Sequence, residues 1–223
     1  MMKEIFAKTN ETDIIQKIVN GETAFFEILI RRYNPVLYKI ARSYGFEHEE
    51  AKDLLQETHI SAYQNLKKFE FRSSYKTWIA KIMVNKCLYK MSYGSNKYET
   101  SHFIDDENAQ PVFSSKKQST EKEVLNKELS HILEKSLEKI PVHYRMVFLL
   151  REVEGFSVSE TAEMLNLTEV NVKVRVSRAK NLLQKELEKY YSKAQLFEFN
   201  LIYCDSVVEY VFAEIKKLTG DKG

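Results

Sequence analysis

Apolar residues recur every three or four positions along most of this chain, the spacing that returns side chains to one face of a helix. Four such stretches precede residue 94, at 14–19, Ala24–Tyr44, His48–Phe69 and Tyr75–Tyr93. We expect Thr12 to cap the first helix, and Gly21 and Gly45 to end the first and the second. Pro35 lies inside the second stretch and should kink or break that helix. No segment has the pattern of a strand pair.

The periodicity is lost between Gly94 and Ser119, where the chain is polar and carries the acidic cluster Asp105, Asp106 and Glu107. This composition indicates a linker. Helical spacing returns at Thr120, where the sequence TEKE forms a capping box at the start of an apolar helix. The next helix is expected to begin at Pro141 and to end at Gly155.

A second capping box, Ser157 to Glu160, opens a short helix with Ala162 and Leu165 on its apolar face. Residues 166–168 form a turn, with Thr168 as the cap of a long basic helix. A short helix, a tight turn and a long helix are the parts of a helix-turn-helix. On the long helix the inward positions are Val172, Val176, Ala179 and Leu183. The opposite face presents Val170, Asn171, Val174, Ser177 and Arg178, flanked by Lys173 and Arg175.

These patterns predict an all-α protein with two helical domains joined by a flexible linker, the second domain containing the helix-turn-helix. The expected divisions are an N-terminal domain over 1–93, the linker over 94–119, a C-terminal domain over 120–190 and an extension over 191–223. The extension has its own apolar residues, which either pack onto the second domain or form a surface for a partner.

Composition narrows the class of protein. Of 223 residues, 34 are Lys or Arg and 32 are Asp or Glu, so any basic patch is local. No apolar run reaches the roughly 20 residues of a membrane span, and the N-terminus has no signal-peptide core, so we expect a cytoplasmic protein without membrane insertion. The two cysteines, Cys87 and Cys204, are far apart, and the five histidines show no ligand spacing. We therefore expect neither a metal nor a cofactor.

One local patch is pronounced: no Asp or Glu occurs between Phe71 and Tyr98, where six cationic residues alternate with six aromatic ones. Cations follow a phosphate backbone and aromatic faces stack on unpaired bases, so the segment suits single-stranded or melting nucleic acid. A solvated basic helix whose aromatic side chains face the core would show the same pattern.

The third predicted helix has a second unusual face. Ala51, Leu55, Thr58 and Ala62 fall on one side. The other side carries Asp53, Gln56, Glu57 and Ile60. An exposed isoleucine within an acidic patch indicates a docking surface for a basic partner helix. A pair of catalytic carboxylates would instead need a cleft and a raised pKa, which a protruding helix face does not supply.

Four segments together resemble bacterial sigma factors, in particular the short two-domain extracytoplasmic-function (ECF) kind. They are DLLQET at 53–58, FRSSYKTWIAKIMVN at 71–85, IPVHYRMVFLLREVEGFSVSETAEML at 140–165 and VKVRVSRAKNLL at 172–183. The resemblance extends over about residues 12–190, with the segments in the family's order. It implies a protein that binds core RNA polymerase, recognises −35 and −10 promoter elements, melts the −10 region and directs initiation, in a stress or envelope response. It also implies an anti-sigma factor as a partner, and no catalysis.

The resemblance also assigns roles to residues. Asp53, Gln56, Glu57 and Ile60 match the positions that grip the clamp helices of the polymerase. Phe69, Phe71, Arg72 and Tyr75 match the loop that captures a flipped −10 base, and Trp78, Lys81 and Asn85 match the helix behind it. Lys173, Val174, Arg175, Ser177 and Arg178 match the helix that reads the −35 element. Two departures are clear: Phe71 and Arg72 stand where many relatives have Gly-Asp, and Asn171 stands where Thr is common.

Two other classes compete with this interpretation. A helix-turn-helix regulator of the response-regulator type shares the start of the basic helix, but it lacks the patch at Asp53, Gln56 and Glu57. An enzyme is disfavoured because the chain shows no glycine-rich phosphate loop, metal cluster or nucleophile elbow. Binding to core polymerase without DNA separates a sigma factor from both.

Overall fold

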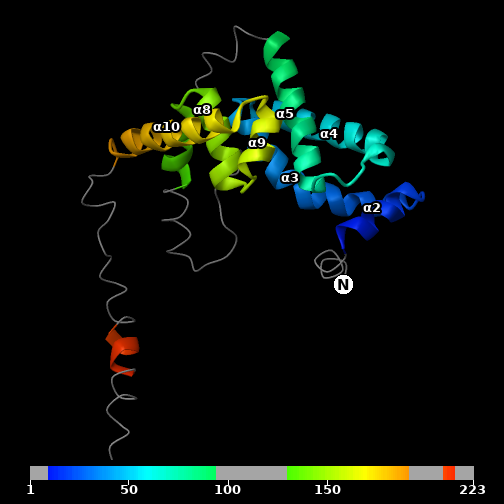
Figure 1. The fold of residues 1–223 in the computed structure, drawn as a ribbon, viewed down its shortest axis with the longest axis horizontal. Coiled ribbons are helices and arrows are strands. Elements are labelled where there is room, and N and C mark those ends of the chain that lie inside the picture. The colour runs from blue at the N-terminus through cyan, green and yellow to red at the C-terminus, as the bar shows by residue number, and fades with distance from the viewer. Residues whose placement is uncertain (1–9, 94–129, 191–207, 214–223) are drawn as a thin grey trace, which may run out of the picture. The chain divides into compact units, whose positions relative to one another are not determined.

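The computed structural model describes residues 10–93, 130–190 and 208–213, and every regular element within them is a helix (Figure 1). The expected all-α class is therefore confirmed. The predicted linker at 94–119 and the capping box at 120–123 lie outside the described residues. Helix 208–213, in a separate unit of the chain, has only exposed side chains.

The first two helices follow the sequence pattern with two corrections. Helix α2 spans Glu11–Val19, and its cap is Asn10, whose side chain accepts a hydrogen bond from the Thr12 backbone N–H at 3.2 Å, so the expectation of Thr12 as the cap was wrong. A short 3₁₀ helix at Thr23–Phe25 leads into α3, Phe26–Ser43. Helix α3 continues through Pro35 and is not broken there. Residues on both sides of the proline, including Tyr33, Leu37 and Ile40, are buried in the core and hold the helix in place.

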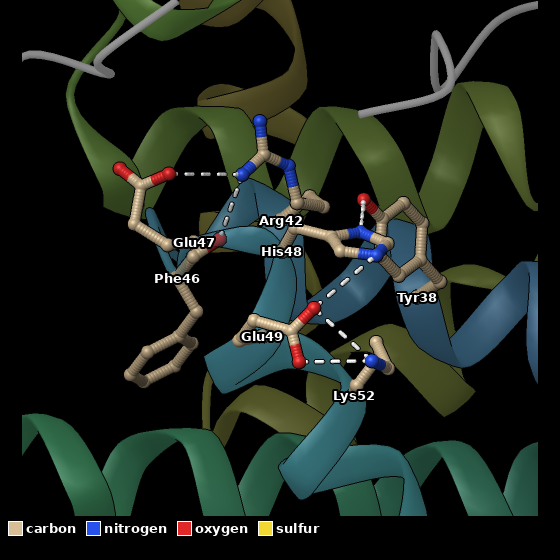
Figure 2. A network of polar contacts seen from close by, with 7 residues as sticks. All are labelled: Tyr38, Arg42, Phe46, Glu47, His48, Glu49 and Lys52. Atoms are coloured by element: carbon tan, nitrogen blue, oxygen red, sulfur yellow. Dashed lines mark hydrogen bonds and ion pairs between the residues drawn. The ribbon is translucent and has the colours of Figure 1, made fainter. Parts of the chain in front are cut away.

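The turn between α3 and α4 is fixed by a polar network (Figure 2). The Arg42 guanidinium donates to the Phe46 carbonyl at 3.1 Å and lies 3.6 Å from the Glu47 carboxylate. Tyr38 and His48 form a hydrogen bond of 2.9 Å between the hydroxyl and Nδ1. Glu47 also takes part in a capping box at the start of α4, so the direction in which α4 leaves the turn is well determined.

Helices α3, α4 (His48–Asn65) and α5 (Tyr75–Tyr93) pack against one another. The third predicted helix ends earlier than expected, because Leu66–Lys68 form a 3₁₀ turn and Phe69 begins a loop. Side chains such as Leu29, Leu54, Ile79 and Met83 fill the space between the three helices and are at most 2% exposed. This packing leaves the outer face of α4 exposed, whereas α5 also contacts the helix at Val158–Leu165 of the second segment.

The second segment begins with helical residues 130–138, followed by α8 (Val142–Phe148) and a π-helical turn at Leu149–Val153. Pro141 is the N-cap of α8, and Gly155 adopts a φ of +73° after the π turn. The predicted start and end of this region are therefore close to those observed.

The helix-turn-helix consists of α9, Val158–Leu165, and α10, Glu169–Leu187. The predicted capping box of Ser157 and Glu160 is confirmed, and Thr168 Oγ1 accepts from the Asn171 backbone N–H at 3.2 Å. Asn166 ends α9 in the left-handed conformation that a tight turn needs. Val172 and Ala179 are fully buried, as the predicted inward face requires.

The two helical segments share one hydrophobic core. Residues from 14 to 87 form it together with Met146, Leu149, Leu150, Phe156 and Met164. A smaller cluster of Val147, Ala162 and Val172 holds α8, α9 and α10 together. The surfaces considered below therefore rest on a common packed interior.

Candidate polymerase and nucleic-acid interfaces

The acidic patch of α4 is exposed as the helical wheel predicted. Asp53, Gln56 and Glu57 all face solvent, and Ile60 is 58% exposed although it is a large apolar residue. Leaving such a side chain in water forgoes the roughly 1.5–3 kcal/mol that burial would contribute. An isoleucine framed by polar groups is thus available for a partner to cover.

Ile60 does not stand alone, because it lines a groove of about 860 Å³ between α3 and α4. The other lining residues are Thr23, Phe26, Ile30, Asn34, Lys52, Leu55, Gln56, His59, Tyr63 and Gln64. The sequence did not single out Phe26 and Tyr63, whose rings make an edge contact with centroids 5.2 Å apart. A side chain inserted from a partner would meet an apolar groove next to an acidic rim.

His59 supports the groove from within α4. It is 5% exposed, and its Nε2 lies 2.8 Å from Asn34 Oδ1. Burial lowers the pKa of this imidazole to about 4, so the ring is neutral near pH 7. His59 is therefore a neutral structural element of the groove and adds no positive charge to the patch.

The loop between α4 and α5 is built on an aromatic cluster. Phe69 is 7% exposed and Tyr75 is 1% exposed. Their rings meet at right angles with centroids 5.8 Å apart, and Trp78 lies against both. Phe69 and Tyr75 therefore hold the loop from below, and their faces are covered by protein. Burial also raises the pKa of Tyr75.

The exposed members of this loop are Phe71 and Arg72. Phe71 is 49% exposed and adopts a φ of +56°, a region that favours glycine. The Phe71 ring lies over Phe69 with centroids 4.7 Å apart. Arg72 pairs with Glu70 at 2.6 Å, an acid just outside the acid-free segment.

Helix α5 carries the remaining residues predicted to bind −10 DNA. Asn85 is exposed, whereas Trp78 and Lys81 are half-buried. The Lys81 ammonium forms a 2.6 Å ion pair with Glu163 of α9. Thr77 donates to the Glu160 carboxylate at 2.5 Å, and Lys76 donates to the Glu154 carbonyl at 2.6 Å. Although α5 has no acidic residue of its own, acidic residues from a distant part of the chain contact its polar side chains.

Glu154 is the most buried of these acids. Its side chain is 6% exposed and lies 2.9 Å from Lys39 and 3.6 Å from Lys76. The Lys76 ammonium also lies 4.7 Å from the centroid of the Phe156 ring. These pairings could not be predicted from the sequence, because residues more than 70 positions apart show no periodic relation.

Helix α10, the long helix of the helix-turn-helix, presents the residues that its pattern predicted. Lys173, Val174, Ser177 and Arg178 are exposed, with Val174 at 42%, and Arg175 is half-buried. The Arg178 guanidinium donates a hydrogen bond of 3.3 Å to the hydroxyl of Tyr144 on α8, and this bond orients the arginine side chain. An arginine so placed can donate two hydrogen bonds to guanine, and a valine can contact a thymine methyl.

Metal-ligand clusters and membrane-spanning helices are both absent from the described residues. No group of three or more His, Cys, Asp or Glu side chains gathers in a way that could hold a metal ion. No helix among those residues is long and apolar enough to cross a membrane.

Comparison with known proteins shows which family the chain resembles. Residues 29–93 match the model of sigma-70 region 2, and residues 130–183 match that of sigma-70 region 4. The ECF RNA polymerase sigma factor SigM of Mycobacterium tuberculosis (strain ATCC 25618 / H37Rv) is 26% identical over 182 residues, 80% of this chain and 85% of the relative. SigW of Bacillus subtilis (strain 168) is 27% identical over 181 residues, 78% and 94% of the two chains.

A solved structure is also similar. The sigma factor RpoE from Bartonella quintana, crystallised with the anti-sigma factor NepR, has a TM-score of 0.57 and 26% identity, with 73% of this chain and 96% of that one covered. The match to sigma-70 region 2 contains most of α3 and all of α4 and α5, and the match to region 4 contains α8, α9 and most of α10. The chain belongs to the sigma-70 family, and its relatives are of the ECF group.

Proposed function

We propose that this protein is an ECF sigma factor that binds core RNA polymerase, recognises −35 and −10 promoter elements, melts the −10 region and directs transcription initiation. The observation that carries the proposal is the presence, in one chain, of an exposed acidic and apolar docking patch on α4 and an exposed recognition helix α10. A helix-turn-helix regulator of the response-regulator type needs only the second.

Polymerase binding is assigned to Asp53, Gln56, Glu57 and Ile60 on α4. Charged rims steer a basic partner and an apolar centre supplies affinity once water is excluded. Ile60 and the groove of about 860 Å³ provide that centre, and the three polar residues provide the rim. The clamp helices of the polymerase are the proposed occupant.

Promoter binding is divided between two surfaces. Phe71, Arg72 and Asn85 are the exposed residues proposed to contact the melted −10 strand, with Phe69, Tyr75 and Trp78 supporting them from the aromatic cluster. Lys81 joins this set when its pairing with Glu163 is released. Lys173, Val174, Arg175, Ser177 and Arg178 are proposed to bind the −35 duplex.

The remaining assignments follow from the class. Sigma factors are initiation factors without catalysis of their own, and they act in the cytoplasm with the polymerase. The similar RpoE was crystallised with an anti-sigma factor, and we extend that kind of partner to this chain. A stress or envelope response is the proposed setting.

The direct test has two parts. Core polymerase with this chain should give a specific run-off transcript from the DNA upstream of its own gene, and core polymerase alone should not. Glu57→Lys should weaken core binding at least about 30-fold, because losing one charge from a desolvated interface costs about 2–5 kcal/mol.

Glu27→Lys is the matched control, since Glu27 is an exposed acid on α3 that does not line the groove. It makes the same change of charge and should keep wild-type core affinity. Equal affinity of wild type and Glu57→Lys would contradict the assignment of α4. A wild-type chain that neither binds core polymerase nor supports run-off would overturn the proposed function.

A further inference from the structure

The second segment covers part of the α5 surface that is proposed to bind −10 DNA. Helix α9 packs against α5, and both segments belong to one compact unit of the chain. Three polar side chains at the start of α5 have acidic partners from the second segment. They are Lys76 with Glu154, Thr77 with Glu160 and Lys81 with Glu163. Phosphate oxygens bind the same cations and hydroxyl groups, so the three carboxylates, hereafter the acidic contact, stand where phosphates of a DNA strand would bind.

Glu154 is the centre of the acidic contact. Its side chain is 6% exposed, and its carboxylate lies 2.9 Å from the Lys39 ammonium and 3.6 Å from the Lys76 ammonium. Lys76 also donates to the Glu154 carbonyl at 2.6 Å. Glu154 directly follows the π-helical turn at Leu149–Val153, a rare conformation that is frequent at functional sites. A single acid thus ties both α3 and α5 to the second segment.

The three pairs differ in how firmly they hold. Removing one partner of a buried ion pair is strongly unfavourable, because the other charge is left uncompensated. Glu154 is in this situation. The side chains of Lys81 and Glu163 are 42% and 65% exposed, and a pair so open to water contributes little. We therefore expect Glu154 to hold the acidic contact closed, with Glu163 adding little.

We propose that the acidic contact is autoinhibitory: it competes with the promoter strand for α5, so that the free chain is closed to −10 DNA. The proposal rests on the proposed function, because it takes α5 as the −10 surface. A DNA strand and the acidic contact cannot occupy Lys76 and Lys81 together, so the strand binds there only after the second segment has moved away. The apparent affinity for the strand is then the intrinsic affinity multiplied by the fraction of open chains.

The other two proposed binding surfaces are accessible in the closed chain. On α4, Asp53 and Glu57 face solvent and Ile60 is 58% exposed. On α10, Val174 is 42% exposed. Polymerase can therefore dock on α4, and duplex DNA can contact α10, while the start of α5 is still covered. Of the three ligands, the −10 strand is the one whose binding requires release of Glu154.

The test measures binding of the full chain, without polymerase, to a labelled single-stranded DNA of random sequence and about 12 nucleotides, by fluorescence anisotropy. Glu154→Gln removes the charge and keeps the shape of the side chain. It should raise single-strand affinity by about 10-fold, because an open state populated to roughly 10% or less gains at least that factor when it becomes dominant. Affinity for the same DNA as duplex should stay at the wild-type value, since α10 is accessible in both states.

Lys39→Met breaks the acidic contact from α3 and separates release of Glu154 from a simple effect of charge. Lys39 belongs to none of the proposed DNA surfaces. Losing a cation would by itself lower the affinity for DNA. Release of Glu154 should instead raise single-strand affinity, by about 3-fold or more, because Lys76 still holds part of the contact.

Glu27→Gln is the matched control for charge. It removes one negative charge from α3, as Glu154→Gln does from the second segment, but Glu27 pairs with Arg31 on its own helix. Its single-strand affinity should stay within about 2-fold of wild type. Lys39 and Lys76 are 26% and 33% exposed and can reach water once Glu154 is changed, so circular dichroism should show normal folding in every variant.

Three results would overturn the proposal. Unchanged or lower single-strand affinity in Lys39→Met would mean that the contact is packing only, whatever Glu154→Gln does. An equal rise in Glu27→Gln would reduce the effect to net charge. An equal rise in duplex affinity for Glu154→Gln would mean that the change does not act through α5.

Failure of this inference can be told apart from failure of the proposed function. If wild type and Glu154→Gln both give run-off transcripts and bind single strands equally, the autoinhibitory contact is wrong and the sigma-factor assignment stands. If no chain supports run-off but Glu154→Gln and Lys39→Met both gain single-strand affinity, the contact stands and the assignment falls.

Discussion

At Phe71 the backbone conformation is unfavourable, whereas the side-chain contact is favourable. Its φ of +56° is disfavoured for any residue with a Cβ atom, whereas its ring gains contact with Phe69. The left-handed region costs such a residue roughly 1–2 kcal/mol. A glycine at this position would avoid the backbone strain, but it would lack the ring that contacts Phe69 and that is proposed to act in the loop.

Two truncations at Phe71 separate these terms. Neither Phe71→Gly nor Phe71→Ala has a ring, so they differ only in the backbone. We expect the Gly variant to be the more stable by about 1 kcal/mol, because only glycine adopts positive φ without strain. This reverses the usual advantage of Ala over Gly. Urea unfolding measures the difference, and an Ala variant as stable as the Gly variant would show that the loop is not held in this conformation.

The buried His59 and the half-buried Glu138 make opposite contributions to the pH dependence of stability. Burial lowers the pKa of His59 from 6.5 to about 4. The unfolded chain then binds the proton more readily, and stability falls as pH drops from 6.5 to 4. Burial raises the pKa of Glu138 from 4.5 to about 7, with Arg145 opposing the rise. There the folded chain binds the proton more readily, and stability falls as pH rises from 4.5 to 7.

Single variants should expose the two opposing slopes. Between about pH 5 and about pH 7.5 each group changes the free energy of unfolding by about 2 kcal/mol, in opposite directions. The advantage of wild type over His59→Gln should therefore grow by that amount as pH rises over this range. The advantage of wild type over Glu138→Gln should shrink by a similar amount. Parallel pH profiles for wild type and either variant, from urea titrations, would refute the corresponding shift.

At the scale of elements, hydrophobic periodicity and capping residues were sufficient to predict most of the described helices from the sequence. The approximate bounds expected for α5 agree with those observed, and the Ser157–Glu160 capping box at the start of α9 was confirmed. The helix does not break at Pro35, because core packing on both sides of the proline outweighs the local rule. Asn10 was missed because Asn and Thr are both good caps and lie two residues apart.

The candidate surfaces were predictable where one helix carries them and less so where several do. Exposure of Asp53, Gln56, Glu57 and Ile60 follows from a helical wheel alone. The burial of Phe69 and Tyr75 does not, because it depends on how the loop folds back over α5. The pairing of Lys81 with Glu163 joins residues far apart in the chain, and only the fold reveals it.

Two variants on helix α10 test which of its faces contacts the base pairs. Arg178 is exposed and oriented by the Tyr144 hydroxyl, and Lys173 lies on the flank. We expect Arg178→Ala to cost about 1–3 kcal/mol and to relax preference at one base pair of the −35 element. Lys173→Ala should weaken all sequences alike and lower the salt slope by roughly one. Binding to a panel of −35 duplexes at several salt concentrations measures both.

Lys180→Ala is the control on the same helix, because the Lys180 ammonium pairs with Glu152 at 2.7 Å. It should leave both affinity and preference close to wild type. Altered base preference in Lys173→Ala together with unaltered preference in Arg178→Ala would mean that α10 meets the groove with a different face.

At the scale of the molecule, the shared core joins helices that the sequence assigned to two domains. Leu149, Leu150, Phe156 and Met164 lie in the same cluster as Ile14, Leu37 and Ile79. Buried polar contacts reinforce this cluster, with Glu154 between Lys39 and Lys76. Residues in one continuous core tend to unfold together.

This cooperativity can be measured with the single tryptophan. Trp78 lies on α5 and packs against the shared core, whereas Leu150 comes from the second segment and is fully buried. Leu150→Ala should cost about 2–5 kcal/mol. Because the core is shared, the urea midpoint seen by Trp78 fluorescence should shift together with the midpoint seen by far-ultraviolet circular dichroism. Val170→Ala, at a site 68% exposed, should shift neither. The opposite result is a Trp78 transition that stays at its wild-type midpoint while part of the helical signal is lost at lower urea. It would mean that the two segments fold independently and that Leu150 stabilises only the second segment.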